Sequence, residues 1–120
     1  MPVRHVVLVV DDDPAVLDLA ALILEERYDV ITAANGHDAL AVIGDDERRI
    51  DLLFTDVVMP EINGFALARM AKERRPTLRV IYATGFAKVA PEEGETLHGP
   101  ILPKPYRPND LLREIERALK

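Results

Sequence analysis

The hydrophobic residues of the chain fall into short uninterrupted runs, separated by longer segments of mixed polarity. Runs of strand length without apolar–polar alternation are typical of strands covered on both faces of a parallel sheet. We therefore predict strands at 6–10, 29–33, 52–56, 78–83 and 101–102. The last of these is minimal, because prolines follow it closely.

Helices are predicted between the strands, where apolar residues recur every three or four positions. The segments with this pattern are 14–27, 35–44, 64–74 and 108–119. Pro14 suits the first turn of a helix, and Asp13 suits its N-cap. The alternation of strands and helices predicts a fourth helix in the segment 86–99. This segment contains one proline and two glycines, which disfavour helix, so we expect only a short or frayed one.

Strand and helix alternate along the whole sequence. This order predicts an α/β fold, a doubly wound five-stranded parallel sheet with right-handed crossovers and helices on both faces. The sequence has no internal repeat, low-complexity segment or linker, so we expect a single domain over residues 1–120.

The first predicted helix carries two apolar stripes. The stripe that we expect to face the sheet consists of Val16, Leu19, Ala20 and Ile23. A second stripe, rotated by about 100°, contains Leu17, Ala21, Leu24 and Tyr28. We expect Leu24 and Tyr28 to widen the core face, and Leu17 and Ala21 to point outward beside the aspartates. An exposed apolar patch in that place is typical of a docking surface.

Composition excludes several classes of protein. The net charge of −6 argues against non-specific nucleic-acid binding. The chain has no cysteine, which excludes a disulfide framework and fits the reducing cytoplasm. No apolar run approaches the ~18 residues that a membrane-spanning helix needs, and the first residues do not resemble a signal peptide.

Charged and hydroxyl side chains follow the predicted strands. Asp11 and Asp12 follow the first strand, Asp56 ends the central one, Thr84 follows the fourth, and Lys104 follows the fifth. The carboxyl ends of parallel strands meet at one edge, where open α/β sheets place their ligands. We therefore expect these five side chains to converge.

Such a cluster requires a cation, since two carboxylates ~4 Å apart repel by about 4 kcal/mol at an effective dielectric of ~20. Carboxylate oxygens suit a hard ion such as Mg²⁺. An ion, an amine and a hydroxyl together neutralise the charge of a phosphoryl group. Asp56 is then a candidate nucleophile that forms an acyl phosphate.

Other interpretations of the same residues stay open at this point. Taken singly, Asp56 and Thr84 are typical turn residues and Lys104 is a typical solvated lysine. A small phosphohydrolase would use Asp11 and Asp13 as an Asp-x-Asp pair, although the chain is short for a cap domain. A flavodoxin-like nucleotide or flavin binder needs a phosphate loop after the first strand, where three aspartates would repel the ligand.

Four motifs in order resemble the receiver domain of two-component response regulators, over nearly the whole chain. They are Val-Val-Asp-Asp-Asp-Pro at 9–14, Thr-Asp-Val-Val-Met-Pro at 55–60 with Gly64, Ala-Thr-Gly at 83–85, and Lys-Pro-Tyr at 104–106. The resemblance implies a flavodoxin-like (βα)5 fold with strand order 2-1-3-4-5. One departure is Ile101, which stands where the family has its switch aromatic.

The resemblance also implies roles for individual residues. Asp56 matches the phosphoacceptor, Asp12 the direct Mg²⁺ ligand, and Asp11 a ligand through water. The backbone carbonyl of Val58 matches a third protein contact to the metal. Thr84 matches the switch hydroxyl and Lys104 the phosphate-contacting lysine, preceding a cis bond to Pro105.

By the same resemblance, the phosphoryl donor is a histidine kinase or a histidine phosphotransfer domain. The protein would catalyse only its own phosphorylation and slow dephosphorylation. We expect the donor to dock on the first helix, at Leu17 and Ala21.

Overall fold

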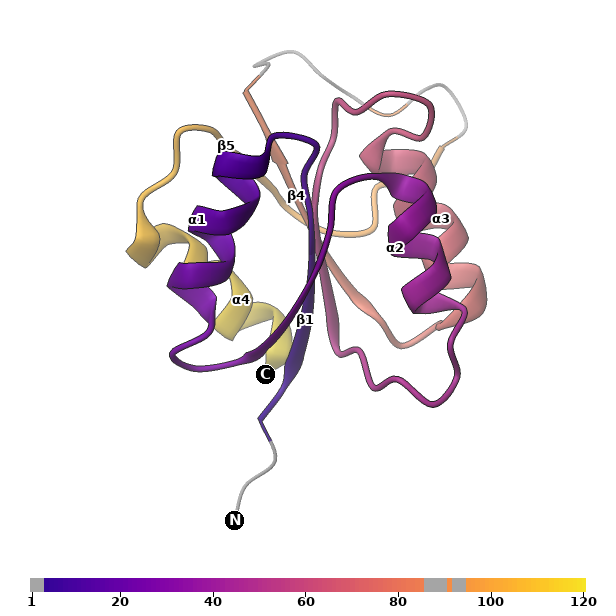
Figure 1. The fold of residues 1–120 in the computed structure, drawn as a ribbon, viewed down its shortest axis with the longest axis horizontal. Coiled ribbons are helices and arrows are strands. Elements are labelled where there is room, and N and C mark those ends of the chain that lie inside the picture. Colours follow the sequence, from indigo (N-terminus) through magenta and orange to yellow (C-terminus); the bar gives the residue numbers. More distant parts are fainter. Residues whose placement is uncertain (1–3, 86–90, 92–94) are drawn as a thin grey trace.

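The computed structural model describes residues 4–85, 91 and 95–120, and these residues form a three-layer α/β structure (Figure 1). The central layer is a parallel sheet, and within the described residues it has five strands in the order β2-β1-β3-β4-β5. Helices cover both faces. The predicted fold class and strand order are therefore confirmed.

The strands of the sheet are β1 (Val6–Val10), β2 (Asp29–Ala33), β3 (Leu52–Asp56), β4 (Arg79–Thr84) and β5 (Ile101–Pro103). The helices in the described part of the chain are α1 (Pro14–Leu24), α2 (Gly36–Ile43), α3 (Gly64–Arg74) and α4 (Pro108–Leu119). Helices α1 and α4 lie on one face of the sheet, and α2 and α3 lie on the other (Figure 1). The short fourth helix that we predicted within 86–99 falls largely outside the described residues.

Element boundaries differ from the prediction by one to three residues, most of all at the end of α1. Helix α1 ends at Leu24, three residues before Arg27, because the amides of Arg27 and Tyr28 both donate to the Leu24 carbonyl and close a turn. Strand β4 begins at Arg79 and includes Thr84 as its last residue. Asp13 caps α1 as predicted, with its carboxylate accepting hydrogen bonds from the amides of Ala15 and Val16.

The sheet-facing side of α1 differs from the predicted one. Leu17, Ala20 and Leu24 are buried, whereas Leu19 is 57% exposed. Residues spaced three and four apart lie on one face of a helix, and in α1 the face that packs on the sheet contains Leu17, Ala20 and Leu24. Both stripes of α1 are apolar, so periodicity did not decide between them. Leu17 is therefore a core residue with 8% exposure, and the prediction that it points outward is wrong.

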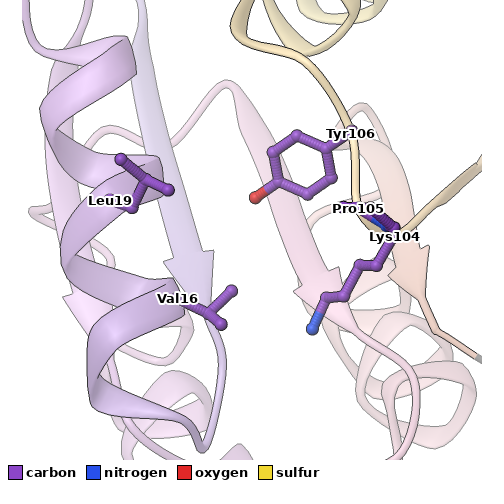
Figure 2. Close-up of a pocket in the computed structure, with 5 residues that line it drawn as sticks. All are labelled: Val16, Leu19, Lys104, Pro105 and Tyr106. Carbon is purple, nitrogen blue, oxygen red and sulfur yellow. The ribbon is translucent and has the colours of Figure 1, made fainter.

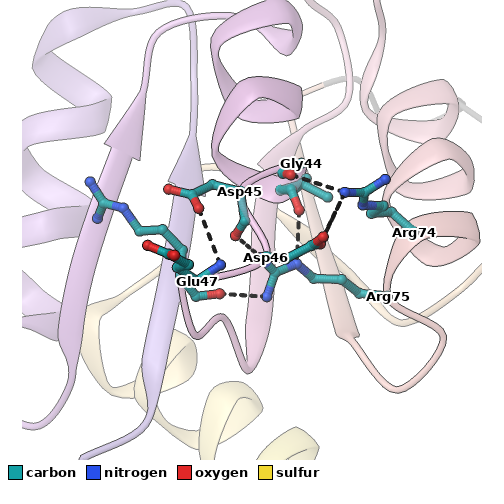
Figure 3. Close-up of polar contacts among 8 residues, drawn as sticks. Gly44, Asp45, Asp46, Glu47, Arg74 and Arg75 are labelled. Atoms are coloured by element: carbon teal, nitrogen blue, oxygen red, sulfur yellow. Dashed lines mark hydrogen bonds and ion pairs between the residues drawn. The ribbon is translucent and has the colours of Figure 1, made fainter.

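Arginines at the end of α3 fasten the polar loop that precedes β3 (Figure 3). Arg75 donates to the backbone carbonyls of Ile43, Arg48 and Asp45 at 2.7–3.0 Å. Arg74 donates to the Gly44 carbonyl and pairs with Asp46. These side chains fix the entry into the central strand.

Candidate functional site

The side chains expected to converge do lie at the carboxyl edge of the sheet. Asp11 directly follows β1, Asp56 and Thr84 are the last residues of β3 and β4, and Lys104 directly follows β5. Asp56, Asp11 and Thr84 are buried, with exposures of 8%, 5% and 6%. Buried polar groups at a strand end are unusual unless they have partners, so their contacts identify the site.

Lys104 bridges the two buried carboxylates. Its ammonium nitrogen Nζ lies 2.9 Å from Asp11 Oδ2 and 3.2 Å from Asp56 Oδ1. The backbone amide of Lys104 donates to the Thr84 carbonyl at 2.8 Å, which ties the lysine to the end of β4. One lysine thus neutralises part of the charge of two aspartates that come from different strands.

Local backbone geometry aims both carboxylates. Asp11 Oδ1 accepts a 2.9 Å hydrogen bond from the amide of Asp13, in the turn that leads into α1. Asp56 Oδ1 accepts a 3.0 Å bond from the amide of Val57. Gly64 permits this arrangement, because a Cβ atom there would overlap the carbonyl oxygen of Asp56. The loop between β3 and α3 therefore requires glycine for its close approach to the site.

The donor set fits a hard divalent cation. Carboxylate oxygens of Asp11, Asp12 and Asp56 all lie within 4.8 Å of one another, with Asp12 exposed and the other two buried. Oxygen ligands of this number and charge suit Mg²⁺, which keeps several waters and takes one or two carboxylates. Val58, the fourth predicted contributor, lies two residues beyond Asp56 in the same loop, and its ligand role stays a prediction.

Burial and neighbouring charges shift the pKa values of Asp56 and Lys104. Burial raises the pKa of Asp56, and the charge of Asp11 raises it further, while Lys104 and the Val57 amide lower it in part. Burial also acts to lower the pKa of Lys104, but the hydrogen bond and charge of Asp11, followed by those of Asp56, outweigh it and raise the pKa. Lys104 is therefore a firm cation that lies closer to Asp11, and the ionisation of Asp56 carries a cost in the folded protein.

A pocket that the sequence analysis did not foresee adjoins the lysine. Its volume is about 290 Å³, and Val16, Leu19, Lys104, Pro105 and Tyr106 line it (Figure 2). The two α1 side chains face the Tyr106 ring across the opening. The Lys104–Pro105 peptide bond is cis, as predicted.

Tyr106 is held from the other side by an edge-on contact with Phe54, at a ring-centroid distance of 5.8 Å. Tyr106 belongs to the Lys-Pro-Tyr motif at 104–106, which by itself predicts no tertiary contact for the ring. Its position next to the sheet core could not be read from local spacing, because Phe54 is far away in the sequence.

Comparison with known proteins decides the family. A family model described as the response regulator receiver domain matches residues 7–116. The chain belongs to this receiver-domain family. It is thus a receiver domain of two-component signalling, and the aspartate cluster fits the phosphoacceptor site of such domains.

Individual relatives agree with the family assignment. The response regulator receiver protein CpdR of Brucella abortus (strain 2308) is 36% identical over 118 residues, 97% of either chain. The response regulator SaeR of Staphylococcus aureus (strain USA300) is 30% identical, and the match covers 93% of this chain but only 49% of SaeR. The solved receiver domain of the hybrid histidine kinase CckA has a TM-score of 0.83 at 32% identity, with 97% of this chain and 100% of that one covered.

The family assignment and the geometry both weigh against the rival interpretations. Receiver domains are signalling domains, and the Asp13 carboxylate that a phosphohydrolase would use is engaged as the cap of α1.

In the described part of the chain, no helix is both long and apolar enough to cross a membrane.

Proposed function

We propose that Asp56 is the residue of this receiver domain that accepts the phosphoryl group. The observation that carries this assignment is the Lys104 bridge, which places an ammonium 3.2 Å from a carboxylate oxygen at the end of the central strand. A buried acid with a raised pKa beside a fixed cation is typical of a functional carboxylate. Asp11 and Asp12 would then serve the metal, and Thr84 and Lys104 would contact the phosphoryl oxygens.

The proposed reaction is an in-line displacement at phosphorus. A carboxylate oxygen of Asp56 forms the new O–P bond while the P–N bond of a phosphohistidine breaks. The electron pair of that bond stays on the imidazole nitrogen. The ring leaves as neutral imidazole, with one proton that was already on the other ring nitrogen or is taken from solvent. We assign the attack to Oδ2, because Oδ1 accepts hydrogen bonds from Lys104 and Val57.

Charge neutralisation is the main catalytic task, since the acceptor and the phosphoryl group are both anionic. The Lys104 ammonium meets one side of the incoming group, and the Val57 amide holds the acceptor in place. Asp11, Asp12, Asp56 and the Val58 carbonyl would hold Mg²⁺. When bound, Mg²⁺ supplies positive charge to the phosphoryl oxygens.

A histidine kinase or histidine phosphotransfer domain is the proposed donor, and it would act in the cytoplasm. We place its docking surface on α1 but not at Leu17, while the predicted part of the half-buried Ala21 stays a prediction. Leu19 and Leu22 are 57% and 63% exposed, whereas Leu17 is in the core. Leu19 also lines the pocket beside Lys104, so an apolar side chain of the donor that enters this pocket would bring its histidine to Asp56.

Intact mass measurement tests the acceptor. The protein is incubated with Mg²⁺ and phosphoramidate, and a gain of one phosphoryl group is expected. Asp56→Asn should abolish the gain, while Asp46→Asn, a change at an exposed loop aspartate, should keep it. A phosphoryl group that persists in Asp56→Asn would refute the assignment.

A further inference from the structure

The strand that delivers Lys104 is the weakest of the sheet. β5 has only three residues, lies at the edge, and is nowhere fully buried. Its pairs with β4 are Tyr82–Ile101, Ala83–Leu102 and Thr84–Pro103. Pro103 has no amide hydrogen and donates no hydrogen bond to the ladder. A strand with so few bonds does not hold its own register.

Lys104 nevertheless needs an accurate position. Its ammonium reaches two different carboxylates at 2.9 and 3.2 Å, so both contacts constrain the same atom. A slip of β5 by one residue would move the chain by ~3.3 Å and turn the lysine to the other face. The register of β5 must therefore be fixed by contacts outside its own ladder.

Such contacts lie in the segment 95–99, just before β5. The backbone amide of His98 donates a 3.2 Å hydrogen bond to the hydroxyl of Tyr82. Tyr82 is fully buried in β4, and its ring packs against Phe65 of α3 at a centroid distance of 5.1 Å. The hydroxyl thus lies at the end of a side chain that has no freedom to move, and it presents a fixed acceptor to the segment.

Two further contacts hold the same segment. The carboxylate of Glu95, whose side chain is 15% exposed, lies 3.4 Å from Arg69 Nε on α3. Gly99 lies so close to β4 that a Cβ atom would overlap the carbonyl oxygen of Val80. The segment is therefore attached to α3 and to β4 at successive points before β5 begins.

We propose that Tyr82 is a positioning residue for Lys104. Its hydroxyl, assisted by the Arg69–Glu95 ion pair, fixes the segment 95–99 and with it the register of β5. The ammonium is thereby held between Asp11 and Asp56. The activity part of this inference rests on the proposed phosphorylation of Asp56.

The test removes only the hydroxyl. Tyr82→Phe keeps the ring and its packing but leaves the His98 amide without its acceptor. Phosphorylation by phosphoramidate should slow by about tenfold, as expected when a catalytic group is misplaced by a fraction of an ångström. Tyr28→Phe, at another buried tyrosine, serves as the matched control and should leave the rate unchanged.

A double-mutant cycle separates positioning from a general loss of structure. If Tyr82 acts through Lys104, Tyr82→Phe should have no further effect in a Lys104→Met background. Glu95→Gln should slow the wild-type protein in the same way, and the exchanged pair Arg69→Glu with Glu95→Arg should restore the rate. Equal losses in both backgrounds, or no loss in the wild type, would overturn the proposal.

A second readout does not depend on phosphorylation. The Lys104 amide is bonded to the Thr84 carbonyl, so its hydrogen exchange reports the register of β5 directly. Exchange at Lys104 should accelerate in Tyr82→Phe and stay unchanged in Tyr28→Phe. If the wild-type protein gains no phosphoryl group, the proposed function is wrong. Hydrogen exchange at Lys104 still tests the role of Tyr82 in that case. Unchanged exchange in Tyr82→Phe would overturn the positioning role.

Discussion

The two acids and the lysine of the site are held by very different parts of the sheet. Asp11 and Asp56 extend from β1 and β3, interior strands whose residues are almost all buried. Lys104 extends from β5, a three-residue edge strand. The anionic half of the site thus follows from the core of the fold, whereas the cationic half, by our proposal, depends on contacts made by the segment 95–99 that precedes β5. Substitutions in the contacts that hold β5, as opposed to Lys104 itself, should accordingly change function more than stability.

The largest expected effect is the loss of the bridge itself. Lys104→Met should slow phosphorylation of Asp56 by about a hundredfold, as expected for the removal of one preorganised donor. It should also destabilise the metal-free protein by roughly 3 kcal/mol, because two buried carboxylates lose their shared cation. Phosphoramidate kinetics and urea unfolding measure the two losses. Lys72→Met is the control that should leave the rate unchanged, because the Lys72 ammonium donates to the Pro76 and Leu78 carbonyls, away from the site.

A comparable loss is expected on the exposed rim of the acidic half. Asp12→Ala should remove most of the Mg²⁺ affinity and most phosphorylation while leaving the fold intact, because Asp12 is exposed and outside the core. It should also relieve like-charge repulsion in the metal-free protein. Calorimetric titration with Mg²⁺ measures the affinity. An unchanged binding isotherm would remove Asp12 from the proposed ligands.

A smaller and more selective effect is expected on α1. Leu19→Glu should slow phosphotransfer from the donor protein by about tenfold, since it places a charge in the rim of an apolar pocket, and leave phosphoramidate kinetics unchanged. Leu17→Glu is the informative counterpart, because it places the charge in the core and should unfold the protein instead. The docking surface would be wrongly placed if both rates fell together in Leu19→Glu.

These contrasts explain which features were predictable from the sequence. The placement of Asp11, Asp56 and Lys104 follows from topology, since each comes directly after an apolar run and parallel strands end at one edge. Strand lengths and helix caps such as Asp13 follow from local chemistry in the same way. The position of a residue at the end of a strand was enough to predict its place in the site, because the parallel sheet brings all strand ends to one edge.

The remaining features depend on tertiary contacts that local patterns do not contain. Both stripes of α1 were apolar, so only the packed structure decides that Leu17 is buried and Leu19 exposed. The bond between Tyr82 and His98 and the pair of Arg69 with Glu95 join residues that are distant in sequence. No spacing rule links them, although they hold the strand that carries the lysine.

The smallest effect concerns the stability of the acidic half. The pKa of Asp56 is raised in the folded protein, first by burial and then by the charge of Asp11. The folded state therefore binds this proton more tightly than the unfolded chain does. The associated stability is present below the unfolded pKa of 3.8 and is lost as the pH rises through the raised folded value.

Near neutral pH the full cost of ionising Asp56 is present, so Asp56→Asn should stabilise the Mg²⁺-free protein there. The gain should shrink as the pH falls toward 3.8, the pKa of Asp56 in the unfolded chain. In that range the folded wild-type protein holds Asp56 protonated, and its side chain is then as neutral as asparagine. Urea midpoints across this range, without Mg²⁺, measure the difference. Lys104 keeps its 2.9 Å contact with Asp11 in this variant, which prevents an opposing loss from a stranded cation. If the stability gain of Asp56→Asn grew on acidification, ionised Asp56 would stabilise the fold. The claim that the buried, charged Asp56 destabilises the metal-free protein would then be wrong.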